Sequence, residues 1–276
     1  MSRFVTINGK VVEKEEINLS YLFWEDRLEV SQKCWFGFGG IPLLKENLEL
    51  LVQQMETVKI PLPALFQNKR ELFRVTKRML NKNKFYRSGF IHFRVFCHNE
   101  QVTSLITSEA FETFDFPFSE NGVLVNYSDY TKHSENPLNP FQFYNQPLWD
   151  VAQAQLQNTL FQNSIFLNEN HTVCEGIHAN LFFIRDKELI TPALSTGCYH
   201  DVLRSIVLKL AAETNLKVTE SDHIQPDDVL QMNEIFMAGE TLGMQWVLGV
   251  ENKRYIHLYS LLIHKKLNQY LKAKVN

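Results

Sequence analysis

Side chains able to do chemistry gather just before a predicted long helix, at Cys198, His200 and Asp201. A thiol at a helix N-terminus can have a lowered pKa and act as a nucleophile. Glu175 and Glu240 add two carboxylates, and together such acids can bind a divalent cation. The simpler interpretation is a half-buried cysteine beside a capping aspartate and a solvent-facing histidine. The spacing leaves these alternatives open.

Several short motifs follow one another along the chain around these residues. Glu175 to Ile184 reads EGIHANLFFI, and Thr191 to Leu194 reads TPAL. Val202 to Arg204 then opens the helix, and Phe236 to Gly239 reads FMAG. In this order they resemble the fold-type IV family of pyridoxal-phosphate (PLP) enzymes, which includes branched-chain aminotransferase, D-amino-acid aminotransferase and aminodeoxychorismate lyase. The resemblance covers nearly the whole chain. It implies an α+β fold with two domains, the D-amino-acid-aminotransferase-like fold of class IV aminotransferases. It also implies a homodimer.

Glu175 matches the family carboxylate that faces the pyridine nitrogen and keeps it protonated, so that the ring acts as an electron sink. The alternative is that Glu175 caps a turn or pairs with a basic neighbour. Asn180 has the same two interpretations, as part of a cofactor site or as a residue that bonds the backbone of the fold.

The family lysine is the position that decides the activity. Counting back from Glu175 without a gap, the resemblance places it at Gln142. PLP chemistry needs a lysine amine to hold the aldehyde and move the substrate proton, and a glutamine amide does neither. The nearest upstream amine is Lys132, in a segment expected to be irregular, which would have to fold back into the cleft to substitute.

The phosphate-binding positions implied by the resemblance also depart from the family. Leu50 stands where an arginine clamps the phosphate, and Asn47 stands at the usual histidine. Asp201, followed by Val202, replaces the glycine at the N-terminus of the long helix, where a carboxylate satisfies the helix amides itself.

The last phosphate loop of the family reads Gly239-Glu240-Thr241 here, so an acid stands where a hydroxyl would bond phosphate. Two carboxylates near a dianion cost several kcal/mol even at an effective dielectric constant of about 20. Asp201 and Glu240 therefore both disfavour the cofactor phosphate.

These departures favour a non-catalytic homologue, a pseudoenzyme that keeps the fold and binds no PLP, with room for another small-molecule ligand in the interdomain cleft. One alternative is an active PLP-dependent aminotransferase or aminodeoxychorismate lyase that uses a recruited lysine. Another is a different chemistry in the cleft, carried by Cys198, His200 and Asp201.

Periodicity places these residues on an ordered series of elements. Asn8-Gly9 predicts an opening hairpin, and helices are expected at about Leu43 to Val58, near Leu148 to Phe161 and from near His200 to Thr214. Pro117 and its polar neighbours break both strand and helix patterns. The sequence thus predicts a small α+β domain at 1–116, an interdomain linker at 117–121 and a larger α+β domain at 122–276.

Composition excludes several classes of partner. The 276 residues carry a formal net charge of -3 and no concentrated basic face, which argues against nucleic acid and anionic membranes. The four cysteines are far apart, with neither C-x-x-C pairs nor zinc-like spacing, so no metal site is predicted and a reducing cytoplasm fits best. No apolar stretch is long enough to span a bilayer.

Overall fold

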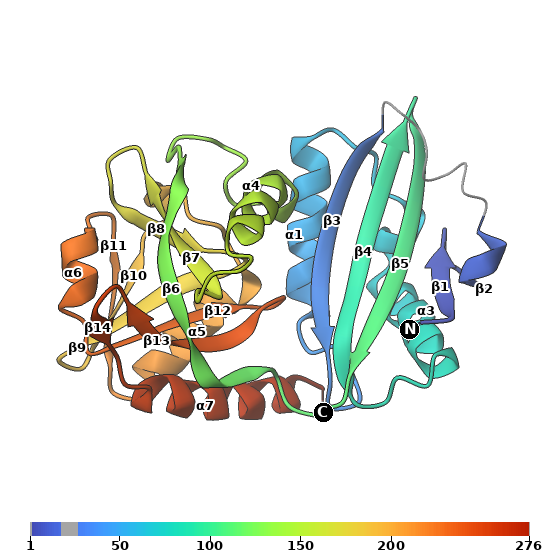
Figure 1. Cartoon of the computed structure of the whole chain (residues 1–276). Helices are drawn as coiled ribbons and strands as arrows, with labels where there is room; N and C mark the ends of the chain where they lie inside the picture. The colour runs from blue at the N-terminus through green and yellow to red at the C-terminus, as the bar shows by residue number, and fades with distance from the viewer. Residues whose placement is uncertain (1, 18–26, 276) are drawn as a thin grey trace. The chain divides into compact units, whose positions relative to one another are not determined.

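The computed structural model describes residues 2–17 and 27–275, and the chain divides into two compact units (Figure 1). The first comprises Met1–Phe116 together with Leu271–Asn276, and the second comprises Pro117–Tyr270. Within the described residues no helix is long and apolar enough to cross a membrane.

A five-stranded antiparallel sheet forms the centre of the first unit, in the order β2-β1-β5-β4-β3. The three long strands β3, β4 and β5 run side by side in Figure 1. The strands are β1 (Phe4–Ile7), β2 (Lys10–Glu13), β3 (Leu28–Phe36), β4 (Ser88–His98) and β5 (Gln101–Phe111), and a short 3-10 turn η1 (Lys14–Glu16) follows β2.

Two tight turns set the register of this sheet. Asn8 and Gly9, which join β1 to β2, both have positive φ, at 45° and 82°, so the predicted hairpin is confirmed. Asn99 and Glu100 join β4 to β5 with φ of 46° and 65°. Each is a two-residue loop whose twist matches that of its flanking strands.

The helices of this unit are α1 (Leu44–Thr57), α2 (Ala64–Gln67) and α3 (Lys69–Lys82). Helix α1 packs on β3, and the Asn68 side chain caps α3 by accepting a hydrogen bond from Glu71 N at 3.1 Å. Between α1 and β3, the buried Gln32 amide accepts from Gln54 and donates to Asn47. The predicted first helix is therefore confirmed, and its Asn47 and Gln54 side chains are tied to β3 through Gln32.

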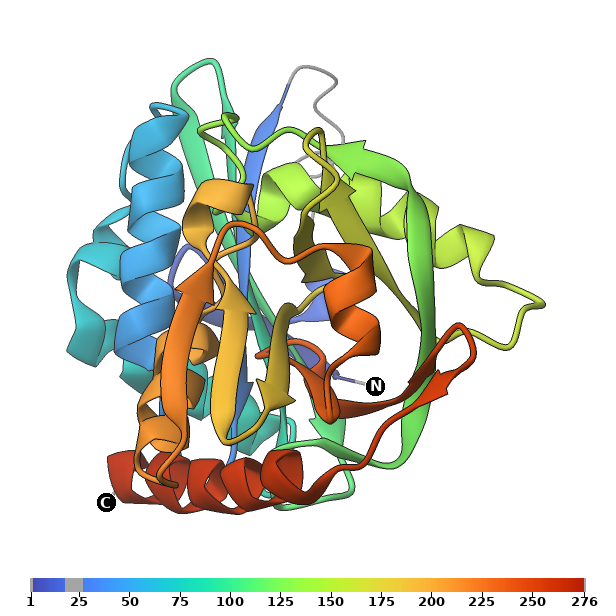
Figure 2. The same ribbon diagram turned by 90° about the vertical axis from the view of Figure 1, so that its left-hand side faces the viewer.

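The second unit is built on a mixed sheet in the order β11-β10-β9-β12-β13-β6-β7-β8, with β14 paired to β13. Figure 2 shows β11, β10 and β9 side by side, in orange to yellow. The strands are β6 (Phe118–Lys132), β7 (Asn163–Asn168), β8 (Val173–Gly176), β9 (Asn180–Arg185), β10 (Glu188–Pro192), β11 (Lys217–Ser221), β12 (Glu234–Gly239), β13 (Gly243–Val250) and β14 (Lys253–Arg254).

Strand β6 differs from the sequence prediction at both ends. The residues expected to form a linker, 117–121, include the start of β6, because Phe118 and Ser119 pair with Met244 and Gln245 of β13. At its other end β6 continues to Lys132, where an irregular segment was expected. Pairing with β13 and β7 supplies the backbone hydrogen bonds that local propensity does not predict.

Four helices complete this unit: α4 (Gln142–Gln155), α5 (Val202–Ala212), α6 (Pro226–Leu230) and α7 (Leu258–Val275), whose last residues belong to the first unit. A 3-10 turn, η3 (Leu194–Thr196), precedes α5. Glu234 of β12 accepts hydrogen bonds from Tyr259 N and Ser260 N and so caps α7. Helix α4 begins six residues before the expected Leu148 and contains Pro147.

Two clusters of buried side chains hold the second unit together. The larger lies among β6, β9, β12 and β13, and includes Val125, Leu181, Ile235 and Val247. The smaller gathers around Trp149 of α4 and includes Phe166, Ile177 and Tyr199. Glu175 lies on β8 between fully buried neighbours, so any charge there must find its partners inside the protein.

Candidate active site

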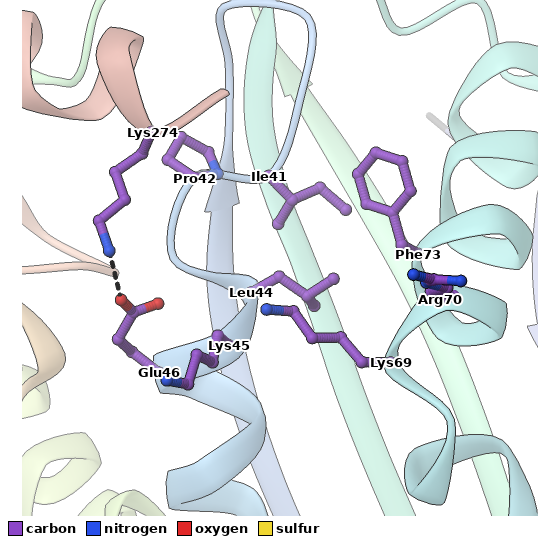
Figure 3. Close-up of a pocket in the computed structure, with 9 residues that line it drawn as sticks. All are labelled: Ile41, Pro42, Leu44, Lys45, Glu46, Lys69, Arg70, Phe73 and Lys274. Carbon is purple, nitrogen blue, oxygen red and sulfur yellow. Dashed lines mark hydrogen bonds and ion pairs between the residues drawn. The ribbon is translucent and has the colours of Figure 1, made fainter. Parts of the chain in front are cut away.

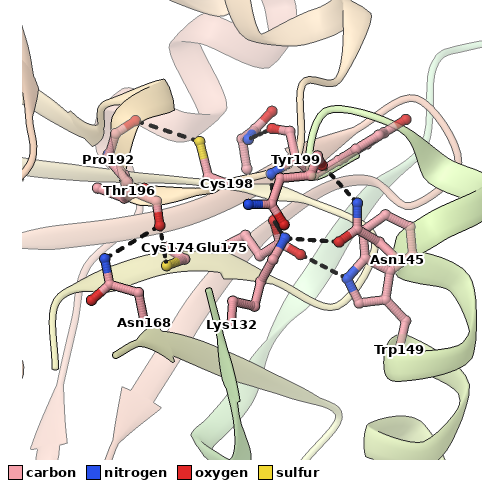
Figure 4. A network of polar contacts seen from close by, with 12 residues as sticks. Lys132, Asn145, Trp149, Asn168, Cys174, Glu175, Pro192, Thr196, Cys198 and Tyr199 are labelled. Carbon is pink, nitrogen blue, oxygen red and sulfur yellow. Dashed lines mark hydrogen bonds and ion pairs between the residues drawn. The ribbon is translucent and has the colours of Figure 1, made fainter. Parts of the chain in front are cut away.

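Glu175 stands at the centre of a buried polar network (Figure 4). Its side chain has no solvent exposure, and three donors converge on it: Lys132 Nζ at 2.8 Å from Oε2, Trp149 Nε1 at 2.8 Å from Oε1, and the backbone amide of Tyr199. Two of these donors are neutral and one is an ammonium group. The carboxylate is therefore both hydrogen-bonded and charge-balanced by the protein itself.

Lys132 reaches Glu175 from the last position of β6, two strands away across β7. The register of β6 against β7 shifts between Tyr127 and Thr131, and just beyond this shift the Lys132 side chain is only 1% exposed. The sequence placed this lysine in an irregular segment that would have to fold back. The structure corrects that expectation, because sheet pairing alone brings the amine to the carboxylate.

A second group orients the ammonium. Lys132 Nζ donates to Asn145 Oδ1 at 2.8 Å, and Asn145 Nδ2 donates in turn to the carbonyl oxygens of Asn139 and Phe141 at 2.7 and 2.8 Å. These two bonds fix which end of the Asn145 amide faces the lysine. The amine is thus held in one place by a side chain that is itself held by the start of α4.

Helix α4 supplies two of the side chains in this network, Asn145 and Trp149, which are four residues apart and share one face. The Trp149 ring also contacts the rings of His178 and Tyr199 edge to face, with centroids 4.6 and 5.0 Å away. These roles of Asn145 and Trp149 were not predicted from the sequence. The spacing of Asn145 and Trp149 was the available signal, and the expected start of the helix at Leu148 concealed it.

Gln142, at the position that the resemblance gives to the catalytic lysine, is the first residue of α4 and is buried. Its side-chain nitrogen donates to Gln146 Oε1 at 3.3 Å, and its side-chain oxygen has no hydrogen-bond partner among the described residues. The neighbouring rings of Phe141 and Phe143 stack on one another with centroids 6.0 Å apart. Gln142 contributes no amine to Glu175 or to its surroundings.

Asp201 caps α5 with its side chain, as the sequence predicts. Oδ1 accepts from Leu203 N at 2.8 Å, and the backbone amide of Glu240, 39 positions later, donates to Oδ1 and Oδ2 at 3.1 and 3.0 Å. The carboxyl group is almost completely buried. Burial raises its pKa from 3.8 to about 6, against the two backbone hydrogen bonds, which lower it.

Asn180 connects the two acidic sites. Its side-chain nitrogen donates to Tyr199 O at 2.6 Å, and its side-chain oxygen accepts from Asp201 N at 3.3 Å. Tyr199 N bonds Glu175, so one short segment between β10 and α5 is fixed at both ends. Of the two interpretations of Asn180, bonding the backbone of the fold describes its contacts.

The remaining predicted positions lie on different elements of the two units. Val202 is the first residue of α5, and Thr241 lies half-buried in the turn between β12 and β13. Leu50 belongs to the first unit, where it is a buried residue of α1. Glu240 follows β12 and is buried.

The thiol alternative fails on burial. Cys198 is only 2% exposed, and its Sγ donates to the carbonyl oxygens of Pro192 and Ala193. Desolvation, with the negative charge of Glu175 as a smaller cause, raises the pKa of Cys198 to about 11. This raised pKa disfavours the thiol alternative, which requires a lowered one, because the thiol faces carbonyl oxygens instead of helix amides. His200, two positions later, is exposed.

A surface cavity of about 520 Å³ lies in the first unit (Figure 3). Its lining includes the apolar side chains of Ile41, Leu44 and Phe73, and the ion pair between Lys274 and Glu46, at 2.8 Å, lies along one side. Among the described residues, no cluster of three or more His, Cys, Asp or Glu side chains could hold a metal ion.

The residues of the network do not fit pyridoxal phosphate. The place where Glu175 would meet a protonated ring nitrogen is taken by Lys132 Nζ at 2.8 Å. No amine stands at Gln142, and the amides that open α5 already bond a carboxylate, Asp201. Each of these contacts is an internal bond that the cofactor would have to displace.

Comparison with solved structures agrees on the fold. A branched-chain amino acid aminotransferase from Thermobaculum terrenum (M3 mutant) superposes with a TM-score of 0.85 over 99% of this chain and 94% of its own, at 18% identity. A putative 4-amino-4-deoxychorismate lyase from Legionella pneumophila gives a TM-score of 0.76 over 88% and 91%, at 17% identity. At these identities the likeness concerns the fold alone.

Sequence comparison gives relatives with two activities. Aminodeoxychorismate lyase of Vibrio harveyi is 30% identical over 149 residues, a match that spans about half of each protein, 51% of this chain and 54% of that one. A probable branched-chain-amino-acid aminotransferase of Aquifex aeolicus is 19% identical over 91% of this chain and 85% of its own. Residues 39–250 match the model of the amino-transferase class IV family, and the chain therefore belongs to that family.

Proposed function

We propose that this chain is a non-catalytic member of the class IV aminotransferase family, one that has kept the fold and lost PLP chemistry. The observation that carries the proposal is the ion pair between Lys132 Nζ and Glu175 Oε2, at 2.8 Å and buried on both sides. The pair joins the one carboxylate that the family chemistry needs to the one amine that this network contains.

Geometry argues that Lys132 cannot replace the missing lysine while this pair exists. The nitrogen of a pyridine ring and the aldehyde carbon of pyridoxal lie at opposite ends of the ring. A carboxylate that serves the nitrogen and an amine that serves the aldehyde must therefore be separated by the width of the ring. Lys132 instead contacts the carboxylate directly.

Energetics supports the same conclusion. Freeing Lys132 for another role would leave Glu175 buried without a counter-charge, and breaking such a pair typically costs about 3–5 kcal/mol. Trp149 and Tyr199 would still donate to the carboxylate but would not neutralise it. The pair thus acts as a structural element of the second unit.

The recruited-lysine alternative has one observation in its favour, which is that Lys132 is buried beside Glu175 at all. It requires the ion pair to open when PLP enters. In that case PLP bound to the protein would form a stoichiometric, reducible link to Lys132. If the ion pair is only structural, no such link would form.

Borohydride reduction separates the two functions. The protein is incubated with PLP, dialysed, reduced with borohydride and digested, and pyridoxyl groups are mapped by mass spectrometry. The proposal expects a colourless dialysed protein and only scattered, substoichiometric labels on exposed lysines. One label per chain at Lys132 would establish the recruited lysine and overturn the proposal.

We propose the remaining properties from family resemblance and composition. The chain forms a homodimer and works in the cytoplasm, where its four free cysteines stay reduced. Any small-molecule ligand that it has retained is recognised without covalent attachment. Sedimentation of the purified protein tests the dimer, and a purely monomeric chain at micromolar concentration would contradict it.

A further inference from the structure

The Asp201 carboxylate is bonded by backbone amides from two segments that are far apart in sequence. Leu203 N belongs to the first turn of α5, and Glu240 N follows β12. Both donors point at one carboxyl group, with distances between 2.8 and 3.1 Å. We call the amides of Leu203 and Glu240 the anion cradle.

Such an arrangement has the chemistry of an oxyanion site. A helix N-terminus combines unpaired amides with the positive end of the helix dipole, and a second amide from a neighbouring turn adds a donor from another direction. In this chain the oxyanion is a side chain of the protein. Its main chain is also held, since Asp201 N donates to Asn180 Oδ1 at 3.3 Å.

A phosphate would need these same two amides. With the carboxylate in place, neither Leu203 N nor Glu240 N is available, and an entering dianion would meet a buried acid. Glu240, whose amide forms part of the cradle, is buried too. Both the hydrogen bonding and the charge of the site therefore exclude phosphate.

We infer that Asp201 is a resident anion that occupies the cradle and closes it to phosphate, and that removing this carboxylate uncovers a site for inorganic phosphate or a phosphate monoester. The inference deepens the proposed function and rests on it in one respect only, that the chain holds no cofactor. The proposed function concerns the amine of Lys132. This inference concerns the negative charge of Asp201, which lies at a separate place in the fold.

Two substitutions of equal charge provide the test. Asp201→Ser keeps a hydroxyl that can cap α5 but is two heavy atoms smaller than aspartate, so it vacates the position of the carboxylate oxygens next to the amides of Leu203 and Glu240. Asp201→Asn is as large as aspartate and keeps the cradle filled. Because both variants lose the same charge, any difference between them reflects the space in the cradle and not the overall electrostatics.

The readout is the amide resonances of Leu203 and Glu240 in two-dimensional NMR spectra during titration with inorganic phosphate at constant ionic strength. We expect both resonances to shift in a saturable way in Asp201→Ser, and to stay unchanged in the wild type and in Asp201→Asn. Phosphate should also raise the melting temperature of Asp201→Ser alone, by roughly 3–6 °C at tenfold or greater excess over its Kd.

Two results would overturn the inference. Saturable shifts of these amides in the wild-type protein would mean that Asp201 does not close the cradle, and this measurement holds even if Asp201→Ser fails to fold. A folded Asp201→Ser with unmoved amides would mean that no phosphate site lies beneath the carboxylate. Neither result depends on a lysine, so failure here is distinguishable from failure of the borohydride test.

Discussion

Lys132 and Glu175 form an ion pair of 2.8 Å whose side chains are 1% and 0% exposed. One comes from the end of β6 and the other from β8, with β7 between them. Asn145 holds the ammonium and Trp149 holds the carboxylate, so α4 supports both partners. A buried pair satisfied in this way fixes local structure, and it makes the chain's own residues the counter-charges of the site.

Removing the cation should destabilise the protein strongly. Lys132→Met leaves Glu175 buried without a counter-charge, and we expect a loss of about 3–5 kcal/mol in the free energy of unfolding, measured by urea titration. Adding Glu175→Gln to this variant removes the stranded charge and should recover part of the loss.

Lys217→Met is the matched control, because Lys217 pairs with Glu188 at 2.9 Å but is mostly exposed. It should cost less than about 1 kcal/mol. Equal effects of the two lysine substitutions would mean that the buried pair contributes no more than a surface pair.

The indole donor can be removed separately. Trp149→Phe keeps an aromatic ring, although a smaller one, and deletes the N–H group that bonds Glu175 Oε1 at 2.8 Å. Because the acceptor is a buried carboxylate, we expect a loss of about 1–3 kcal/mol.

Trp246→Phe provides the comparison, since its Nε1 donates to the neutral carbonyl of Glu120 at 3.2 Å. Its hydrogen bond should contribute about 0.5–1.5 kcal/mol. A loss at Trp149 no larger than that at Trp246 would show that the indole is not needed to satisfy the Glu175 carboxylate.

The sequence predicted the opening hairpin, the first helix and the Asp201 cap because all three follow from local patterns. Asn8-Gly9 and a carboxylate before a helical stretch act over a few residues, and local chemistry decides them. Lys132 could not be assigned in this way. Its burial depends on the pairing of β6 with β7 and on a register shift between Tyr127 and Thr131, which are long-range events.

The Asp201 carboxyl should make stability depend on pH with a definite sign. Its pKa is about 6 in the folded protein against 3.8 as a model value, so the folded state binds the proton more tightly than the unfolded state. The contribution of the Asp201 proton to the free energy of unfolding is therefore fully present below about pH 4, and it is lost as the pH rises through 6. Over that range the wild type should lose up to about 3 kcal/mol relative to Asp201→Asn.

Urea unfolding of both proteins between pH 4 and 8 measures this difference, and subtracting the two curves removes the contribution of all other titrating groups. A difference that stays flat with pH, or that favours the wild type as the pH rises, would contradict the raised pKa of Asp201.

The buried thiols should resist alkylation. Burial raises the pKa of Cys198 to about 11 and raises that of Cys174 as well, so neither is a thiolate at neutral pH. Cys97 is partly exposed and serves as the internal reference. With iodoacetamide at pH 7.5, mass mapping should find Cys97 labelled first and the other two labelled only after unfolding. Rapid labelling of Cys198 in the native protein would contradict this prediction and would support Cys198 as a nucleophile.

We propose that the chain's own charges have replaced those of the cofactor, and borohydride trapping after incubation with PLP and dialysis distinguishes this proposal from covalent PLP binding. We predict no visible absorbance from lysine-bound pyridoxal and no stoichiometric pyridoxyl label, with Lys132 recovered unmodified. One pyridoxyl group per chain on Lys132, together with a retained absorbance band, would show that Lys132 binds PLP covalently and that the chain is not a non-catalytic homologue.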